Sequence, residues 1–297
     1  MFDRGAPRLV RAIWTLFSVH FALGIIAYLH FLVTGTYVWL GWFFVVAGSL
    51  FFLVMTATEC WLAFTCRSWF DADEPMRLAW GMIAFAALAR LAGVVIREVA
   101  DGRLPWGPVQ LRPLFSGVFA NLGQMGLFVG GPLSMAFLAI GLGRVLQTQR
   151  RFRLRGPLTL GDRVLLVLIV AFSVSQLLIN LSLLGGHPSP GTVLLWLSDP
   201  LLALLLIEAV LVRRAVVRIG QGLLAKCWGM FVMAIVTTSL GDAAIWANNH
   251  DLLSERLTAL SWYIWFVAAA AFASAPAYQL AAISIVQEPN LRQPASR

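Results

Sequence analysis

The chain contains very little charge. Only 12% of its 297 residues are Asp, Glu, Lys or Arg, whereas charged residues make up about 25% of a soluble domain. Such a sequence cannot cover a water-facing surface, so lipid must surround most of the folded chain. Its apolar runs repeatedly reach the roughly 20 residues with which a helix crosses a bilayer. The composition therefore predicts an all-α fold, a polytopic transmembrane helical bundle.

Lysine is almost absent, since Lys226 stands alone beside 21 arginines. The net charge of +8 does not indicate a nucleic-acid partner, because the sequence has no soluble basic module that would bind one. The arginines gather in some loops and avoid others, as the cytoplasmic bias of basic residues predicts for a polytopic protein. Lys226 lies near the expected cytoplasmic end of a span, where its amine would reach the interface. This position argues against a Schiff base with retinal.

Cysteine and histidine are also scarce. Cys60, Cys66 and Cys227 form neither a disulfide framework nor a metal-ligand pattern. His20 and His30 share one expected span, about 15 Å apart along its axis and on different faces. A haem with two histidine ligands needs one histidine from each of two helices, so we expect neither haem nor a metal, and no other cofactor. His20 and His30 are better explained as core or interface residues.

Enzyme signatures are missing as well. The sequence contains no GxSxG, no HExxH and no P-loop. The sequence thus leans away from an enzyme.

The hydrophobic pattern predicts eight spans, three of them (the second, fourth and eighth) longer than a bilayer requires. With the N-terminus inside, the cytoplasmic segments and span ends hold 17 of the basic residues and the external segments hold 4, while Arg90 stays within a span. This bias predicts an inner (cytoplasmic) membrane protein with both termini in the cytoplasm. The basic N-terminal stretch before the first span predicts a retained helix and not a signal peptide. The spans are expected near Ala12–Val33, Val38–Thr65, Leu78–Ile96, Ser116–Gly143, Val164–Leu184, Thr192–Val212, Leu223–Ala247 and Leu257–Val286.

An internal repeat relates the first four spans to the last four. Its matches occur in the same order in each half, although chance is an alternative because apolar helices share few residue types. Four is an even number, so both halves would enter the membrane from the same side as a parallel repeat. The matches are Trp80-Gly81-Met82 with Trp228-Gly229-Met230, Ala86 with Ala234, Gly93 with Gly241, Phe17-Ser18-Val19 with Phe172-Ser173-Val174, Leu23 with Leu178 and Leu29 with Leu184.

The repeat predicts the domain organisation. Residues 1–148 form a first four-helix repeat, 149–162 a basic cytoplasmic linker, and 163–297 the second repeat. Pro132 and Pro276 lie inside the fourth and eighth spans among small residues, and we expect both to kink their helices.

Charged residues inside a bilayer cost several kcal/mol each, so they are the candidates for a functional site. They are Arg90, Asp199, Asp242, Glu59 and Glu208.

One interpretation of these charges is a polar cavity between the halves, in which Arg90 faces an anionic ligand or one of the acids. The alternative is a buried ion pair that only fixes helix packing. Glu208 and Glu59 have a simpler explanation too, because Arg213 and Arg67 follow them within reach of the membrane interface. Asp199 with Pro200 is also compatible with a turn-like break near the outer surface.

These observations support two main hypotheses. In the first, the protein binds or transports a small apolar or amphiphilic molecule in a cleft between the two halves. In the second, it is a non-catalytic membrane subunit or sensor module that docks a membrane-protein partner or a second copy of itself. A third, weaker hypothesis is an intramembrane enzyme acting on lipid, with Glu59 or Glu208 as its base. In all three the lipid bilayer is the surrounding partner.

Overall fold

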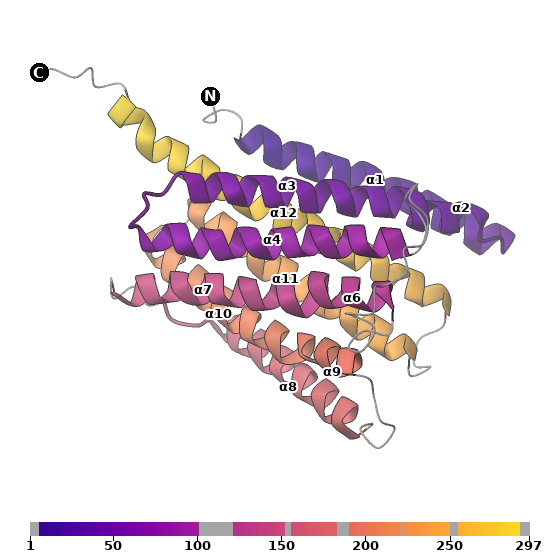
Figure 1. Cartoon of the computed structure of the whole chain (residues 1–297). Helices are drawn as coiled ribbons and strands as arrows, with labels where there is room; N and C mark the ends of the chain where they lie inside the picture. The colour runs from indigo at the N-terminus through magenta and orange to yellow at the C-terminus, as the bar shows by residue number, and fades with distance from the viewer. Residues whose placement is uncertain are drawn as a thin grey trace, which may run out of the picture. The chain divides into compact units, whose positions relative to one another are not determined.

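The computed structural model describes residues 6–100, 121–151, 156–182, 190–220, 222–249 and 255–291. In this part of the chain every element is a helix and no strand occurs, and eight of the helical segments are long and apolar enough to cross a membrane (Figure 1). The predicted all-α polytopic bundle is confirmed. The helices are α1 (Ala6–Thr34), α2 (Val38–Trp42), η1 (Phe43–Gly48), α3 (Ser49–Ser68), α4 (Pro75–Ala100), α6 (Leu122–Phe128), η2 (Val129–Leu133), α7 (Ser134–Arg151), α8 (Leu160–Ser182), α9 (Pro190–Trp196), α10 (Ser198–Ile219), α11 (Leu223–Asn249) and α12 (Glu255–Leu291).

The observed spans follow the expected ones closely. The fourth span is described from Leu122, and the start expected at Ser116 lies outside the described residues. α4 begins at Pro75, as is favourable at the first helical position, where a missing N–H costs nothing. The predicted linker is partly helical at both ends, because α7 continues to Arg151 and α8 begins at Leu160.

Two spans contain a π-helical segment, η1 in the second and η2 in the fourth. Pro132 lies within η2, where its missing N–H breaks the regular hydrogen-bond ladder. The Ser134 hydroxyl donates to the carbonyls of Gly130 and Gly131, 2.6 and 2.9 Å away, and so satisfies acceptors at this break. Pro276 lies inside α12. The kinks expected at the two prolines stay predictions.

The chain divides into two compact units. Unit 1 comprises Met1–Asp71 and Val216–Arg297, and unit 2 comprises Ala72–Ala215. Each unit therefore contains helices from both sequence halves. The division follows spatial contacts and does not test ancestry, so the repeat and its domain boundaries stay predictions.

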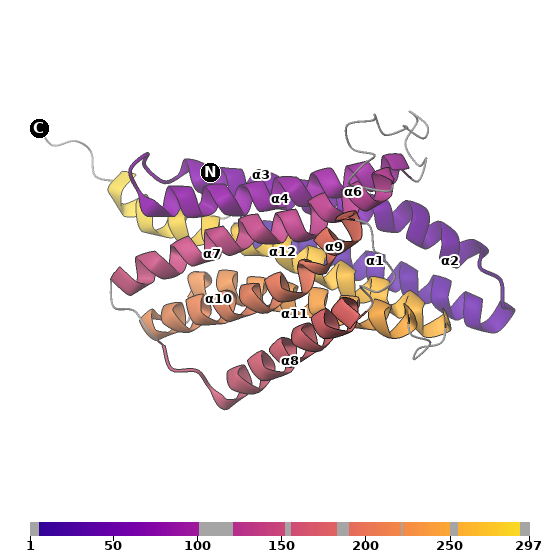
Figure 2. The ribbon, with the colours of Figure 1, turned by 60° about the horizontal axis from the view of Figure 1, so that its bottom comes forward.

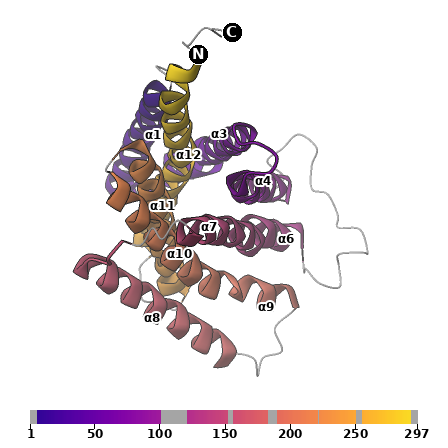
Figure 3. The same cartoon turned by 90° about the vertical axis from the view of Figure 1, so that its left-hand side faces the viewer.

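Unit 1 is organised around α12, which packs against α1, α3 and α11. Figure 3 shows α1 and α12 side by side. Aromatic residues fill the core of this unit, among them the fully buried Phe266 and the almost fully buried Phe43 and Phe51. The Tyr263 hydroxyl donates to the carbonyl of Gly24, 2.7 Å away, and so links α12 to α1.

Unit 2 is organised around α4, which packs against α6, η2 and α7. Figures 1 and 3 both show α4 and α7 running side by side. The closest approach is at Gly93, where an added Cβ would lie 2.5 Å from the backbone N and Cα of Gly130. Small residues permit this approach, and van der Waals packing of this kind stabilises helix pairs in membranes.

The matched positions of the predicted repeat have similar surroundings. Trp80 and Trp228 are both buried, the first in unit 2 and the second in unit 1. Gly93 and Gly241 both lie at close helix contacts, since a Cβ on Gly241 would collide with the indole of Trp265. A repeat would produce this resemblance, and so would efficient packing of small residues.

Candidate functional site

The structure divides the five intramembrane charges between the two units. Arg90, Asp199 and Glu208 belong to unit 2, while Glu59 and Asp242 belong to unit 1. Unit 2 therefore holds three of the five candidates.

Glu208 lies on α10 and faces α7. Its Oε1 would lie 3.1 Å from a Cβ added to Gly143, so the carboxylate occupies space left by the missing side chain of that glycine. Its Oε2 is buried and has no hydrogen-bond partner among the residues that the structure describes. A buried acceptor without a donor costs about 1–3 kcal/mol, and more when it is charged. In native structures such groups are few, and each needs a physical explanation.

Gln149 provides a second contact between the same two helices. The side chain is buried, and its Nε2 donates to the carbonyl of Val212 at 3.4 Å. Its Oε1 is also buried without a donor in the described part of the chain. Val212 follows Glu208 by one helical turn, so both contacts lie on the same face of α10. Gly143, Gln149, Glu208 and Val212 define what we call the α7–α10 seam.

The buried face of α8 is largely polar, although most of this span is apolar. Ser173 and Gln176 are buried, and Asn180 continues the same stripe one turn later. The Asn180 amide donates to Oδ2 of Asp199 at 3.2 Å. Asp199 therefore has a side-chain partner on α8, in addition to its position before Pro200 in the first turn of α10. Nε2 of Gln176 is buried and has no acceptor within the described ranges.

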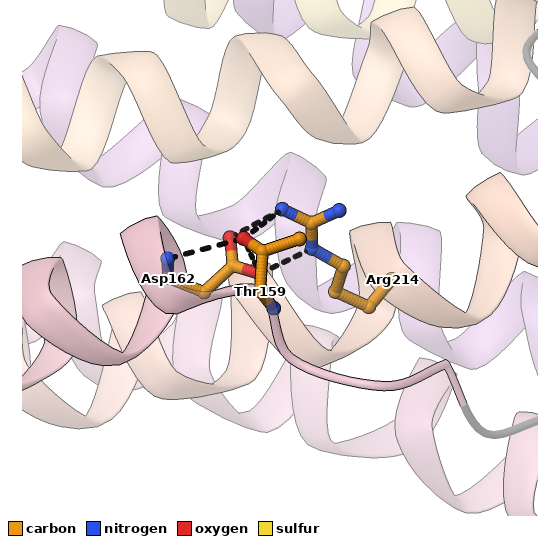
Figure 4. A network of polar contacts seen from close by, with 3 residues as sticks. All are labelled: Thr159, Asp162 and Arg214. Atoms are coloured by element: carbon orange, nitrogen blue, oxygen red, sulfur yellow. Dashed lines mark hydrogen bonds and ion pairs between the residues drawn. The ribbon is translucent and has the colours of Figure 1, made fainter.

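The other end of α8 is locked to α10 by a charged network (Figure 4). Thr159 and Asp162 form a capping box: the Thr159 N–H donates to Asp162 Oδ2 at 2.7 Å, and the Asp162 N–H donates to Thr159 Oγ1 at 3.3 Å. Arg214 of α10 donates through Nη2 to Asp162 Oδ1 at 2.7 Å and to Thr159 Oγ1 at 2.9 Å. Its Nε forms an ion pair with Asp162 Oδ2 at 2.5 Å. Charge-assisted contacts of this kind are strong and geometrically specific.

The chain before α8 is fitted closely to this network. Figure 2 shows it passing the end of α10, where a Cβ on Gly156 would collide with the carbonyl of Arg214. A second contact at the opposite end of unit 2 joins α6 to α9, since Nε2 of Gln124 donates to Thr192 Oγ1 at 3.2 Å. Gln124 of the predicted first half thus contacts Thr192 of the second half, in addition to the contacts in the seam.

The remaining predicted site residues have partners of their own. Arg90, Glu59 and Asp242 each make an interaction with another group. Glu59 is almost completely buried in α3 of unit 1, and Arg90 and Asp242 are partly buried. The interpretation that a charge only fixes helix packing through a partner therefore suits these three residues better than it suits Glu208.

His20 occupies the aromatic core of unit 1. Its ring stacks between Phe43 and Phe51 at centroid distances of 4.6 and 4.4 Å, and the edge of Phe266 meets it at 4.4 Å. Its Nε2 is buried with no hydrogen-bond partner in the described structure. A core position for this histidine agrees with the expectation from the sequence. No group of three or more His, Cys, Asp or Glu side chains that could hold a metal occurs among the described residues.

Sequence reasoning missed Gln149, Gln176 and the pair of Asp162 and Arg214. Two signals were available. Thr159 and Asp162 have the spacing of a capping box just before an apolar run, and Ser173, Gln176 and Asn180 recur at helical spacing.

No protein-family model matches the chain, and neither a curated protein nor a solved structure matches it.

Proposed function

We propose that this integral membrane protein binds a small amphiphilic molecule in the α7–α10 seam, and that the molecule has a cationic or hydrogen-bond-donating head. The observation that carries this proposal is the Glu208 carboxylate, whose buried Oε2 has no donor in the described part of the chain. An ammonium or hydroxyl group of a ligand would supply that donor. The Oε1 of Gln149, likewise buried without a described donor, would be a second acceptor for the ligand.

The position of the seam supports binding between the two sequence halves. Gly143 of α7 belongs to the predicted first half, Gln149 begins the predicted linker and α10 belongs to the second half, yet all contribute to the seam within unit 2. Ligand sites in helical membrane proteins with repeated halves lie at the interface of the repeats. Oε1 of Glu208 stands close to where a side chain on Gly143 would begin, so a larger residue there would displace the carboxylate.

The surroundings favour an amphiphile over a fully hydrophilic solute. α7 and α10 are apolar spans, and residues next to the seam such as Leu142, Leu205 and Ala209 are buried and apolar. A hydrophilic solute would leave most of its polar groups without partners there, at a cost of about 1–3 kcal/mol for each. A molecule with one polar head and an apolar body would avoid that cost.

The proposal is tested with a dansyl-labelled alkylamine as the probe. Its binding to the purified full-length protein in detergent is followed by dansyl fluorescence, and its uptake is followed in proteoliposomes. A charge-assisted hydrogen bond contributes about 1.5–3 kcal/mol, so Glu208→Gln should weaken binding about tenfold or more. Asp199→Asn is the matched control, because it makes the same acid-to-amide change on the same helix at a residue that keeps an acceptor for Asn180.

One further variant and one further probe complete the test. Gly143→Leu should reduce binding of the amine because its side chain would displace Oε1 of Glu208. The alkyl alcohol of equal length should bind more weakly than the amine to the wild type and equally to Glu208→Gln. Equal amine affinity in wild type, Glu208→Gln and Asp199→Asn, with all three folded, would reject the site. Stable co-purification of a second polypeptide would then favour the hypothesis of a docking subunit.

A further inference from the structure

The outward face of α1 carries an open, shallow patch that the seam does not explain. Its described lining residues all come from α1 and are Arg8, Arg11, Ala12, Thr15, Leu16 and Val19. All six lining residues are exposed.

The spacing of these residues makes one continuous stripe. They recur at intervals of three and four positions, so they line a single face of α1 over about 16 Å of helix axis. The face roughly opposite holds Ile13 and His20, which are buried in the aromatic core of unit 1. α1 therefore uses one side for the core and presents the stripe to its surroundings.

The stripe is polar at one end and apolar at the other. Arg8 and Arg11 lie near the N-terminal end of the apolar span, followed by Thr15, whereas Ala12, Leu16 and Val19 continue into the span. Guanidinium groups bind phosphate with paired, geometrically matched hydrogen bonds. A free phosphate or an acidic peptide would use the charges and leave the apolar part unoccupied. A phospholipid matches both parts.

We propose that this face of α1 is a specific binding site for an anionic phospholipid. The phosphate lies between Arg8 and Arg11, Thr15 contacts the head or glycerol region, and an acyl chain follows Ala12, Leu16 and Val19. The proposal is independent of the α7–α10 seam, because it concerns unit 1 and a ligand of opposite charge.

The experiment is native mass spectrometry of the full-length protein, titrated with phosphatidylglycerol or with phosphatidylcholine of the same acyl chains. We expect one saturable phosphatidylglycerol and weaker binding of phosphatidylcholine. Arg8→Gln with Arg11→Gln should weaken phosphatidylglycerol binding about 30-fold, since each arginine near an anionic lipid surface contributes about a factor of five. The matched control is Arg150→Gln with Arg151→Gln, which removes two exposed charges at the end of α7.

A second pair of variants tests the apolar part without changing charge. Ala12→Trp places a bulky ring on the patch beside the arginines, whereas Ile26→Trp alters an exposed residue further along α1 and outside the patch. The first should reduce phosphatidylglycerol binding at least tenfold and the second should leave it unchanged. Equal effects of the two arginine pairs, equal effects of the two tryptophans, or equal binding of both lipids would overturn the proposal. Circular dichroism of each variant shows that it is folded.

Discussion

Gly93→Ala should destabilise the protein because there is no room for one methyl group at this position. A Cβ would lie 2.5 Å from the backbone N and Cα of Gly130 and 2.8 Å from the carbonyl of Gly126. Ordinary contacts of a Cβ begin at 3.4 Å, so the two backbones must separate by roughly 1 Å. A gap of 0.5–1 Å already removes a quarter to a half of the dispersion energy of each atom pair that it separates.

Backbone atoms cannot rotate away as a side chain can, so the clash spreads along the contact of α4 with α6 and η2. We expect a cost of about 1–3 kcal/mol, the range for overpacked cores. Gly41→Ala, in α2, is the matched control, since its added Cβ would meet nothing within 4 Å outside the backbone of its own helix. Both variants gain helix propensity, up to about 1 kcal/mol, so the difference between their unfolding free energies isolates the clash.

The assay is unfolding by a graded addition of dodecyl sulfate, followed by near-ultraviolet circular dichroism of the purified protein in detergent. Gly241→Ala extends the comparison to unit 1. Its Cβ would meet the Trp265 indole, a side chain that can move, so the loss should be smaller than at Gly93. Equal stabilities of Gly93→Ala and Gly41→Ala would refute the packing argument.

Two further predictions concern polar groups. Arg214→Gln should lower the unfolding free energy by about 1.5–3 kcal/mol, because it removes charge-assisted bonds to the buried Asp162. Arg213→Gln is the control at the neighbouring residue. Similar losses for both variants in the same unfolding assay would contradict the role assigned to Arg214. His20→Phe should leave stability unchanged or raise it by about 1–3 kcal/mol, because a ring is kept while a buried nitrogen without a described partner is removed. His20→Ala should cost about 3 kcal/mol or more by leaving a cavity among Phe43, Phe51 and Phe266. A marked loss for His20→Phe would mean that the imidazole has a polar role in unit 1.

Candidate residues could be proposed from the sequence, but their surroundings could not. A charge in a 20-residue apolar run is visible in one dimension, and this is why Arg90, Glu59 and Glu208 were proposed. Whether such a charge has a partner depends on residues far away in the chain. Glu59 and Arg90 have partners, whereas the acceptor oxygen of Glu208 has no donor in the described residues. Gln149 and Gln176 were overlooked because a neutral amide in a span costs less than a charge and stands out less.

The sequence by itself determined that this is a bundle of membrane-length helices. Hydrocarbon leaves backbone polar groups without water, so each long apolar run must satisfy its hydrogen bonds internally as a helix. The tertiary structure alone decided which helices pack together, because apolar helices resemble one another and lipid provides no hydrophobic force to select their neighbours. That choice depends on local fit, such as Gly93 against Gly130 and Glu208 beside Gly143. The tertiary structure also brings α7 and α10, which are far apart in the sequence, together in one seam.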